Sequence, residues 1–289
     1  MRAAGDRDLK VYGIFGYPLS HTVSPAIQNC AFEFHRLKAV YFAFERPPAR
    51  FRFLMRNIKS LVLDGFNVTI PFKEAIIPYL DQLSREAKLV GAVNTVKKQN
   101  GRWIGYNTDI EGFLAGLKQA GFKPRGKSAV VLGARGSARA VVFALAQNGA
   151  RKISVVNRTK SRAQNLIRKF RRSFPNIQWV ACDFKANEWK HALSQADLLV
   201  NATKVGLKKN DPSLVLKKLF PKRKILVYDL IYQPRQTALL RSAAGSGHKI
   251  VNGETMLLYQ GAKAFEIWTG KRAPVSKMKK ALRDALCAQ

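Results

Sequence analysis

Short apolar runs alternate with helix-like patterns along the first hundred residues. Three runs have the length and composition of buried β-strands: Lys10–Phe15, Val40–Phe44 and Phe66–Ile70. Apolar residues recur at helical spacing after Ser24-Pro25 and again after Pro47-Pro48. A serine followed by a proline is typical of a helix start, with Ser24 as the N-cap. This part of the chain therefore predicts strands and helices in alternation.

Two further apolar runs flank a tight-turn sequence. Val93–Val96 and Trp103–Tyr106 lie on either side of Gln99-Asn100-Gly101. Asparagine followed by glycine readily adopts the positive φ angles that a two-residue hairpin turn needs. The sequence therefore predicts a β-hairpin after the first alternation.

A second alternation begins at Ser128. It contains five apolar runs of strand length: Ala129–Leu132, Ile153–Val156, Trp179–Ala181, Leu198–Val200 and Ile225–Tyr228. A helix is expected over Ser137–Asn148, with Gly149 as its C′ stop, and a basic helix over about 161–172. This is the pattern of a doubly wound α/β domain with a parallel sheet. Two more helices are expected, over Thr255–Trp268 and Val275–Leu286.

Composition narrows the class of protein. The 289 residues, 47% of them apolar, suffice for two domains with substantial cores. No apolar window is long enough to span a membrane, and the first residues lack the apolar core of a signal peptide. Cys30, Cys182 and Cys287 are odd in number and far apart, which argues against a disulfide framework or a zinc site. We therefore expect a cytoplasmic protein without a structural metal.

The net charge is the unusual feature of the composition. The chain carries 51 basic and 18 acidic side chains, a formal net charge of +33, and residues 112–253 hold 28 of the basic and 5 of the acidic ones. Such an excess attracts polyanions without sequence preference. A nucleic-acid-binding or scaffolding protein is therefore a second hypothesis, although no strand interleaves aromatic with basic residues as in RNA-binding sheets.

Glycines at the start of the second alternation indicate a dinucleotide site. Gly133-Ala134-Arg135-Gly136-Ser137-Ala138 follows a strand and opens a helix, whose N-terminus favours a pyrophosphate. An ordinary strand–helix connection is the alternative. Arg135 occupies the place of the second glycine, where its Cβ predicts strain or a displaced turn and its guanidinium predicts attraction. From the sequence, we expect the steric effect to be the larger.

The next strand–helix turn bears on the choice of cofactor. It reads Asn157-Arg158-Thr159, followed by Lys160 and Arg162. An NAD site has an acidic residue here for the ribose 2′-hydroxyl, whereas cations and hydroxyls suit a 2′-phosphate. The turn therefore predicts NADP, with a solvated basic helix start as the alternative.

Three polar segments carry a family resemblance. They are Asp64–Lys73, Gly91–Thr95 and Gly105–Asp109, in that order and followed by the glycine turn. Together they resemble the shikimate dehydrogenase family, and the resemblance runs from about Tyr12 to Trp268. It implies an α/β protein of two α/β domains: a substrate domain, residues 1–111 and 254–289, and a Rossmann-type doubly wound NADP-binding domain, residues 112–253, with the C-terminal helices returning to the first.

The resemblance also implies an activity. The family reduces 3-dehydroshikimate reversibly to shikimate with NADPH, in chorismate and aromatic amino acid biosynthesis. A quinate/shikimate dehydrogenase that uses NAD is the nearest alternative. A catalytically weak, strongly basic polyanion-binding variant of the fold is the alternative from another class. The expected partners are the small substrate and, non-specifically, polyanions, for a monomer or homodimer.

Matching positions assign roles to residues by the same resemblance. Lys73 and Asp109 are the expected catalytic pair, which moves a proton to or from the reacting oxygen. A solvent-exposed lysine and a helix N-cap are their structural alternatives. The expected substrate-binding residues are Thr22, Ser24, Asn67, Thr69, Asn94, Tyr232 and Gln260. The expected cofactor-binding residues are Gly133, Ala134, Arg135, Gly136, Ser137, Asn157, Arg158, Thr159, Arg162, Asn201, Thr203 and Gly253. Lys204 departs from the family pattern, and His21 is expected to make only a local contact.

Overall fold

The computed structural model describes residues 9–20, 22–185, 187–208 and 210–288, so His21 lies outside the described residues. The chain forms two compact units. Unit 1 holds the residues up to Thr108 together with those from Leu258 onward, and unit 2 holds Asp109–Leu257. The boundaries expected from the sequence, after residues 111 and 253, lie a few residues from these divisions.

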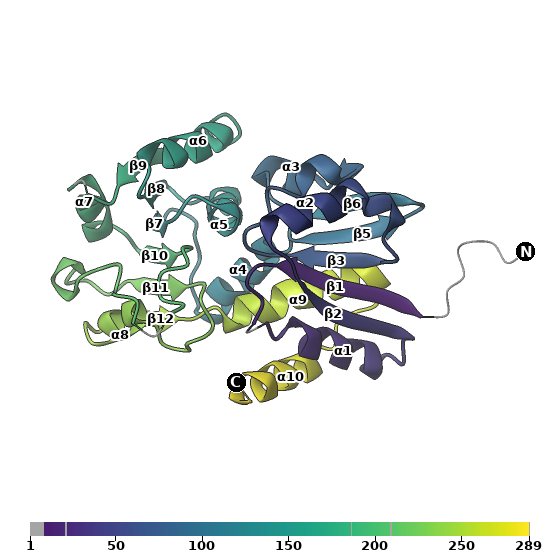
Figure 1. Ribbon diagram of the computed structural model, residues 1–289. Helices are drawn as coiled ribbons and strands as arrows, with labels where there is room; N and C mark the ends of the chain where they lie inside the picture. The colour runs from purple at the N-terminus through teal and green to yellow at the C-terminus, as the bar shows by residue number, and fades with distance from the viewer. Residues whose placement is uncertain (1–8, 21, 186, 209, 289) are drawn as a thin grey trace, which may run out of the picture. The chain divides into compact units, whose positions relative to one another are not determined.

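Unit 1 is built on a mixed six-stranded sheet in the order β2-β1-β3-β5-β6-β4 (Figure 1). The strands are β1 (Lys10–Gly16), β2 (Ala39–Glu45), β3 (Gly65–Val68), β4 (Gln82–Leu83), β5 (Thr95–Gln99) and β6 (Arg102–Tyr106). The first three pair in parallel, whereas β5 pairs antiparallel with both β3 and β6. The hairpin predicted at Asn100-Gly101 is confirmed, since both residues have the positive φ angles of 50° and 74° that its turn needs.

Helices cover both faces of this sheet. They are α1 (Ser24–Phe34), α2 (Pro48–Arg56), α3 (Arg85–Val90), the part of α9 (Glu254–Thr269) from Leu258 onward, and α10 (Val275–Cys287), with 3₁₀ turns at Ile58–Ser60 and Ile77–Tyr79. In Figure 1, α2 and α3 lie over one face and α1, α9 and α10 over the other. The core under α2 is rich in aromatic residues, and the rings of Phe51 and Phe72 stack with centroids 3.8 Å apart.

Unit 2 is a doubly wound domain. Its strands are β7 (Ser128–Leu132), β8 (Lys152–Asn157), β9 (Gln178–Asp183), β10 (Leu198–Asn201), β11 (Leu226–Asp229) and β12 (Lys249–Val251). All are parallel, in the order β12-β11-β10-β7-β8-β9. In the order of the chain this is 6-5-4-1-2-3, the Rossmann arrangement that places ligands at the carboxyl ends of the strands.

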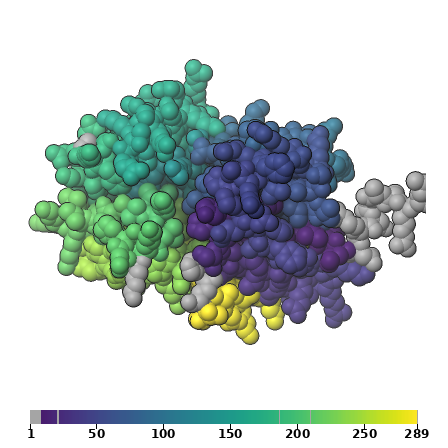
Figure 2. All heavy atoms as spheres, viewed as in Figure 1, coloured from purple at the N-terminus to yellow at the C-terminus, as the bar shows by residue number. Residues whose placement is uncertain are grey.

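The helices of unit 2 are α4 (Asp109–Gln119), α5 (Gly136–Gln147), α6 (Lys160–Arg171), α7 (Glu188–Ser194) and α8 (Ala238–Ala244), with a 3₁₀ turn at Lys217–Leu219. In the view of Figure 2, the atoms of this unit form a closely packed outer surface. The glycine stop of α5 is confirmed. Gly149 has a φ of 76°, and its N–H donates to the carbonyl of Ala146 at 3.1 Å.

Several short elements are absent from the sequence-based prediction, namely β4, α3, α7, α8 and β12. For α3 the sequence does hold the necessary information. The Ser84 hydroxyl accepts a hydrogen bond from the N–H of Ala87 at 3.1 Å, and Gly91, with a φ of 66°, ends the helix. Helices of this length are too short to show a hydrophobic period, so their capping residues are the main signal in the sequence.

Candidate active site

A buried polar centre lies where β3 meets the start of β5 in unit 1. Asn67, 6% exposed, donates from Nδ2 to the carbonyl of Asn94 at 3.0 Å and to the Thr95 hydroxyl at 2.9 Å. Its Oδ1 accepts from the Tyr41 hydroxyl at 2.6 Å. Burial raises the pKa of Tyr41 well above its ordinary value, so this phenol stays a donor at neutral pH. The centre is therefore a fixed set of amide and hydroxyl groups.

The same centre reaches the end of the hairpin and α9 through Asn94, which is 2% exposed. Its Oδ1 accepts from the backbone N–H of Thr108 at 2.8 Å, and its Nδ2 donates to the Thr108 hydroxyl at 3.0 Å. Nδ2 also donates to Oε1 of Gln260 at 3.3 Å. Three of the expected substrate-binding residues, Asn67, Asn94 and Gln260, are thus brought together in unit 1.

Backbone contacts position the two residues expected to carry the chemistry. The carbonyl of Lys73, a half-buried residue in the loop after β3, accepts from the N–H of Val93 at 2.7 Å. Asp109, 3% exposed, follows Thr108 directly and is the first residue of α4. Val93 bonds to Lys73, and its neighbour Asn94 bonds to Thr108, the residue before Asp109. One short segment therefore anchors both sites. Thr69, also half-buried, precedes this loop, and its N–H donates to the carbonyl of Phe15 at 2.9 Å.

The start of α1 differs from the sequence-based prediction in one respect. Ser24 is not the N-cap, because the helix begins at Ser24 itself and Val23 occupies the cap position with no side-chain capping bond. Ser24 is 8% exposed, and its N–H donates to the Thr22 hydroxyl at 3.5 Å. The prediction of a Ser24 cap is therefore wrong. Thr22 and Ser24 instead lie against each other at a helix N-terminus, an arrangement suited to a carboxylate.

The glycine turn of unit 2 has the geometry of a dinucleotide cradle. Gly133 follows β7 with a φ of 109°, and a Cβ there would lie 3.0 Å from the carbonyl oxygen of Ala202. Ala134 and Arg135 follow, and α5 begins at Gly136 with Ser137 in its first turn. The expectation of strain at Arg135 is wrong. Its φ of −93° and ψ of −172° are ordinary extended values, and its side chain is exposed.

The turn from β8 to α6 presents cations to solvent. Arg158, Thr159 and Arg162 are exposed, and α6 starts at Lys160. The Asn157 side chain closes the turn by donating to the carbonyl of Thr159 at 2.9 Å. No acidic residue lies between Asn157 and Arg162, so nothing in this turn repels a phosphate.

Asn201 and Thr203 shape the loop after β10. Asn201, fully buried, donates from Nδ2 to Oδ1 of Asp229 at 2.9 Å and to the carbonyl of Val205 at 3.1 Å. Its Oδ1 accepts from the Thr203 hydroxyl at 2.8 Å. These contacts fix the loop that lies against Gly133, and Lys204 in that loop is exposed.

The remaining expected residues of unit 2 lie near the end of β11. Burial raises the pKa of Tyr232, so its hydroxyl stays protonated at neutral pH. Gly253 is buried, and its N–H donates to the carbonyl of Ile231 at 3.0 Å.

Sequence reasoning missed the partners that hold these residues. In unit 1 they are Tyr41, Thr95 and Thr108. In unit 2 they are Asp229 and Thr237, whose hydroxyl donates to Oδ2 of Asp229 at 2.7 Å. The sequence offered one clue to these partners. Asp229 lies at the end of a strand, in the same segment as Tyr232, where loops usually carry functional residues.

Three family models match most of the chain. They are the shikimate dehydrogenase substrate-binding domain at residues 14–96, shikimate/quinate 5-dehydrogenase at 117–237 and the shikimate 5′-dehydrogenase C-terminal domain at 253–283. The chain is also 43% identical to the shikimate dehydrogenase (NADP⁺) of Methanopyrus kandleri, over 97% of both chains. The chain belongs to the shikimate dehydrogenase family. The resemblance found in the sequence is thereby confirmed.

Solved members of the shikimate dehydrogenase family share its fold. The crystal structure of the Thermus thermophilus enzyme with NADP(H) and shikimate superposes with a TM-score of 0.84 at 38% identity, over 96% of this chain and all of that one. The quinate dehydrogenase of Corynebacterium glutamicum, in complex with NAD, gives a TM-score of 0.85 at 29% identity, over 96% of this chain and 100% of that one. The expected fold class, two α/β domains with a Rossmann-type second domain, is confirmed.

Two features are absent from the described residues. No helix among them is long and apolar enough to cross a membrane. Within the same residues, no group of three or more histidine, cysteine or acidic side chains could hold a metal ion.

Proposed function

We propose that this chain catalyses the reversible, NADPH-dependent reduction of 3-dehydroshikimate to shikimate, a step of chorismate and aromatic amino acid biosynthesis. The 43% identity to a shikimate dehydrogenase (NADP⁺) over 97% of the chain carries this proposal. The buried centre around Asn67 and Asn94 supports it, because fixed amide and hydroxyl groups suit a ring with several hydroxyls.

NADPH would be held by the turns at the carboxyl ends of β7 and β8. The glycine turn and the start of α5 suit the pyrophosphate, and Arg158, Thr159 and Arg162 suit the 2′-phosphate. The cofactor supplies the hydride. The chain's own part is to bind and orient the cofactor and the substrate, and to move one proton.

The proton would pass through Lys73 and Asp109. Reduction of a ketone places negative charge on its oxygen, and a lysine ammonium can both stabilise that oxygen and protonate it. The carboxylate of Asp109 is the partner that the family resemblance assigns to this lysine. In unit 1, Ser24 and Thr22 would take the carboxylate of the substrate, and Asn67, Thr69, Asn94 and Gln260 its ring hydroxyls. The role of Tyr232 stays a prediction from the family resemblance.

The direct test follows NADP⁺ reduction at 340 nm when shikimate is added, with quinate and NAD⁺ as the alternative substrate and cofactor. We expect shikimate with NADP⁺ to be the preferred pair. A preference for quinate with NAD⁺ would favour the alternative that the C. glutamicum relative represents. Lack of turnover with every pair would favour a polyanion-binding variant of the fold.

The basic turn after β8 gives the first prediction. Arg158→Ala should weaken NADPH binding and leave NADH use unchanged, because only NADPH carries the 2′-phosphate. The loss of one charge-assisted contact, about 1.5–3 kcal/mol, corresponds to roughly a 10- to 100-fold higher KM. Steady-state kinetics with both cofactors measure it. Equal use of NADPH and NADH by the unmodified protein would contradict the assignment.

Arg135 gives the second prediction, and its sign follows from the structure. The sequence-based preference for the steric effect rested on a Cβ at the closest approach to the pyrophosphate and on the strain it would cause, and the backbone at Arg135 is unstrained. The attraction of an exposed guanidinium for the diphosphate is then the larger effect. Arg135→Gly should raise the KM for NADPH by up to about fivefold, since an exposed charge pair contributes about 0.2–1 kcal/mol. The KM for shikimate serves as the internal control, and a lower KM for NADPH would restore the steric interpretation.

Ser24 gives the third prediction. Because Ser24 does not cap α1, Ser24→Ala should leave the melting temperature unchanged within about 2 °C. The KM for shikimate should rise by roughly tenfold or more through loss of a hydrogen bond to the carboxylate. The opposite pattern, a lower melting temperature with an unchanged KM, would make the residue purely structural.

We place the enzyme in the cytoplasm, as a monomer or homodimer. All three cysteines are free thiols, which suits a reducing compartment.

A further inference from the structure

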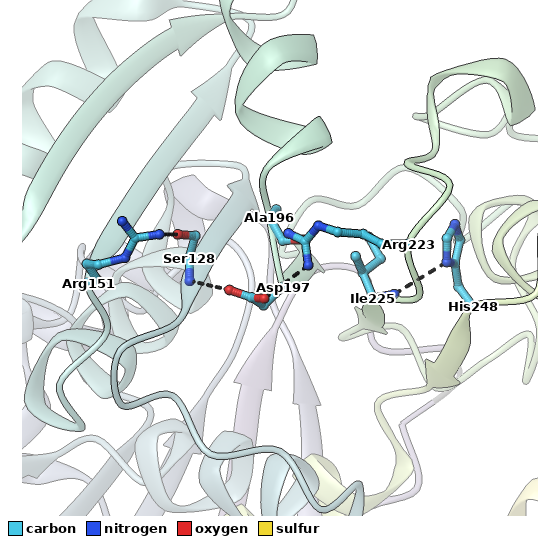
Figure 3. A network of polar contacts seen from close by, with 7 residues as sticks. All are labelled: Ser128, Arg151, Ala196, Asp197, Arg223, Ile225 and His248. Carbon is cyan, nitrogen blue, oxygen red and sulfur yellow. Dashed lines mark hydrogen bonds and ion pairs between the residues drawn. The ribbon is translucent and has the colours of Figure 1, made fainter.

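The amino ends of the parallel strands of unit 2 gather basic side chains that the proposed reaction does not use. Parallel register brings together the residues that precede neighbouring strands: Lys127 before β7, Arg151 before β8, Asp197 before β10 and Lys224 near the start of β11. Figure 3 shows Arg151, Ser128, Asp197 and Arg223 following one another across these strand ends. We define the amino-edge patch as Arg125, Lys127, Arg151, Lys222, Arg223 and Lys224, all of them exposed.

Backbone hydrogen bonds hold this edge in place. The N–H of Arg151 donates to the carbonyl of Lys127 at 2.8 Å, and the N–H of Asp197 donates to the carbonyl of Ser128 at 2.8 Å. The carbonyl of Asp197 in turn accepts from the N–H of Leu226 at 3.0 Å. The cations are therefore presented from a fixed backbone, which lowers the entropy lost when a partner binds.

One acidic side chain lies in the segments that lead into these strands. That residue, Asp197, is already engaged, since its Oδ1 contacts Nη1 of Arg223 at 3.1 Å and its Oδ2 accepts from the N–H of Ser128 at 2.8 Å. Within the described part of the chain, no ion pair joins Lys127, Lys222 or Lys224 to a carboxylate. The patch thus keeps a strong positive charge.

The negative ends of helix dipoles offset only part of this positive charge. The helices α5, α6, α7 and α8 each end shortly before a strand begins, so their C-termini lie at the same edge. Each C-terminus carries about half a negative charge, or about two charges for four helices. Six basic side chains against Asp197 and about two dipole charges leave an excess of positive charge, which attracts anions.

The form of the patch fits a duplex backbone. It crosses the neighbouring strands β11, β10, β7 and β8, about 14 Å at the usual strand spacing. Along the axis of a duplex, that length corresponds to about four base-pair steps of about 3.4 Å each. Single-strand binders add exposed aromatic side chains on which bases stack. Among the described residues, none of the large exposed apolar side chains lies in these segments, and Phe220 is half-buried against His248, with ring centroids 5.0 Å apart.

We propose that the amino-edge patch of unit 2 is a sequence-independent docking surface for the phosphate backbone of a double-stranded nucleic acid. The expected cofactor residues Gly133, Asn157 and Asn201 lie at the carboxyl ends of β7, β8 and β10, the opposite edge of the same sheet. Docking therefore leaves the dinucleotide turns open.

The test compares two variants of equal net charge. Lys127→Glu/Arg151→Glu/Lys224→Glu alters the patch, and Lys279→Glu/Lys280→Glu/Arg283→Glu removes the same charge from the exposed face of α10 in unit 1. Fluorescence anisotropy would follow binding of a duplex of about 20 base pairs and arbitrary sequence, and of a single strand of equal length, between about 50 and 300 mM salt, a range over which phosphate contacts weaken measurably.

We expect the patch variant to bind the duplex on the order of 10²-fold more weakly at about 0.1 M salt, with a salt slope reduced by about 2.7, as for three lost phosphate contacts. The α10 variant should lose much less. An equal loss in both variants would show that diffuse charge is responsible, and tighter binding of the single strand would overturn the duplex assignment. If the patch variant does not fold, Lys127→Gln/Lys222→Gln/Lys224→Gln and Lys279→Gln/Lys280→Gln/Arg283→Gln give a comparison of equal net charge with smaller losses.

Discussion

Lys73→Ala is expected to lower kcat by roughly 10²–10⁴-fold, the range found when a general acid–base group is removed. The lysine is the proposed proton donor, so its loss affects the chemical step more than binding. Its carbonyl already bonds to Val93, a contact that alanine keeps, so the loop should retain its position. Asp109→Ala should have an effect of the same order. Steady-state kinetics with NADPH and 3-dehydroshikimate measure both.

The controls for this pair are the KM for NADPH and the conservative variant at Lys73. The KM for NADPH should hardly change in Lys73→Ala, because the proposed cofactor turns lie in unit 2. Lys73→Arg keeps the positive charge but binds its proton too tightly to give it up, so it should restore substrate binding without restoring kcat. Near-normal turnover in Lys73→Ala or Asp109→Ala would contradict the assignment of these two residues as the catalytic pair.

Gly253→Ala is expected to cause the largest loss of stability. A Cβ at this buried position would overlap the carbonyl oxygen of Leu230, and the N–H of Gly253 is tied to the carbonyl of Ile231 at 3.0 Å, so neither segment can move away freely. Forcing an atom into packed backbone costs about 3 kcal/mol or more. The melting temperature should fall by on the order of 10 °C, as thermal unfolding followed by circular dichroism would show.

Gly245→Ala is the matched control for Gly253→Ala. It places the same methyl group in unit 2, where the nearest backbone oxygen, that of Arg241, lies 3.4 Å from the new Cβ. Its melting temperature should stay within about 2 °C of the unmodified protein. If the two variants have the same melting temperature, the overlap at Leu230 is relieved by a backbone shift, and Gly253 is not required for packing.

Local patterns in the sequence were enough to predict the main elements. The Asn100-Gly101 turn specified the hairpin, because few other pairs adopt two positive φ angles cheaply. The runs at Ala129–Leu132 and Ile153–Val156 predicted buried parallel strands, because both faces of such strands are covered. The glycine turn at Gly133 and the absence of acid after Asn157 predicted the cofactor class from local chemistry alone.

Other features could not be predicted from sequence spacing. The contact of Tyr41 with Asn67 joins residues 26 positions apart, and that of Asn94 with Gln260 joins residues 166 apart. Periodicity reports which side chains are buried, but not which of them meet. The cap of α1 is a smaller example: Ser24 fits the statistics of a cap, yet the incoming chain places Val23 there.

The sequence by itself determined the family, the alternation of strands and helices and the residue types of the proposed site, because each depends on neighbours along the chain. Only the tertiary structure decided that Asn67, Asn94, Thr108 and Gln260 share one hydrogen-bond network, and that Lys127, Arg151 and Lys224 lie along one edge of a sheet. The physical reason is the same in both cases. Strand register and helix packing bring distant segments together to bury apolar surface, and the polar groups they carry are then placed by that packing.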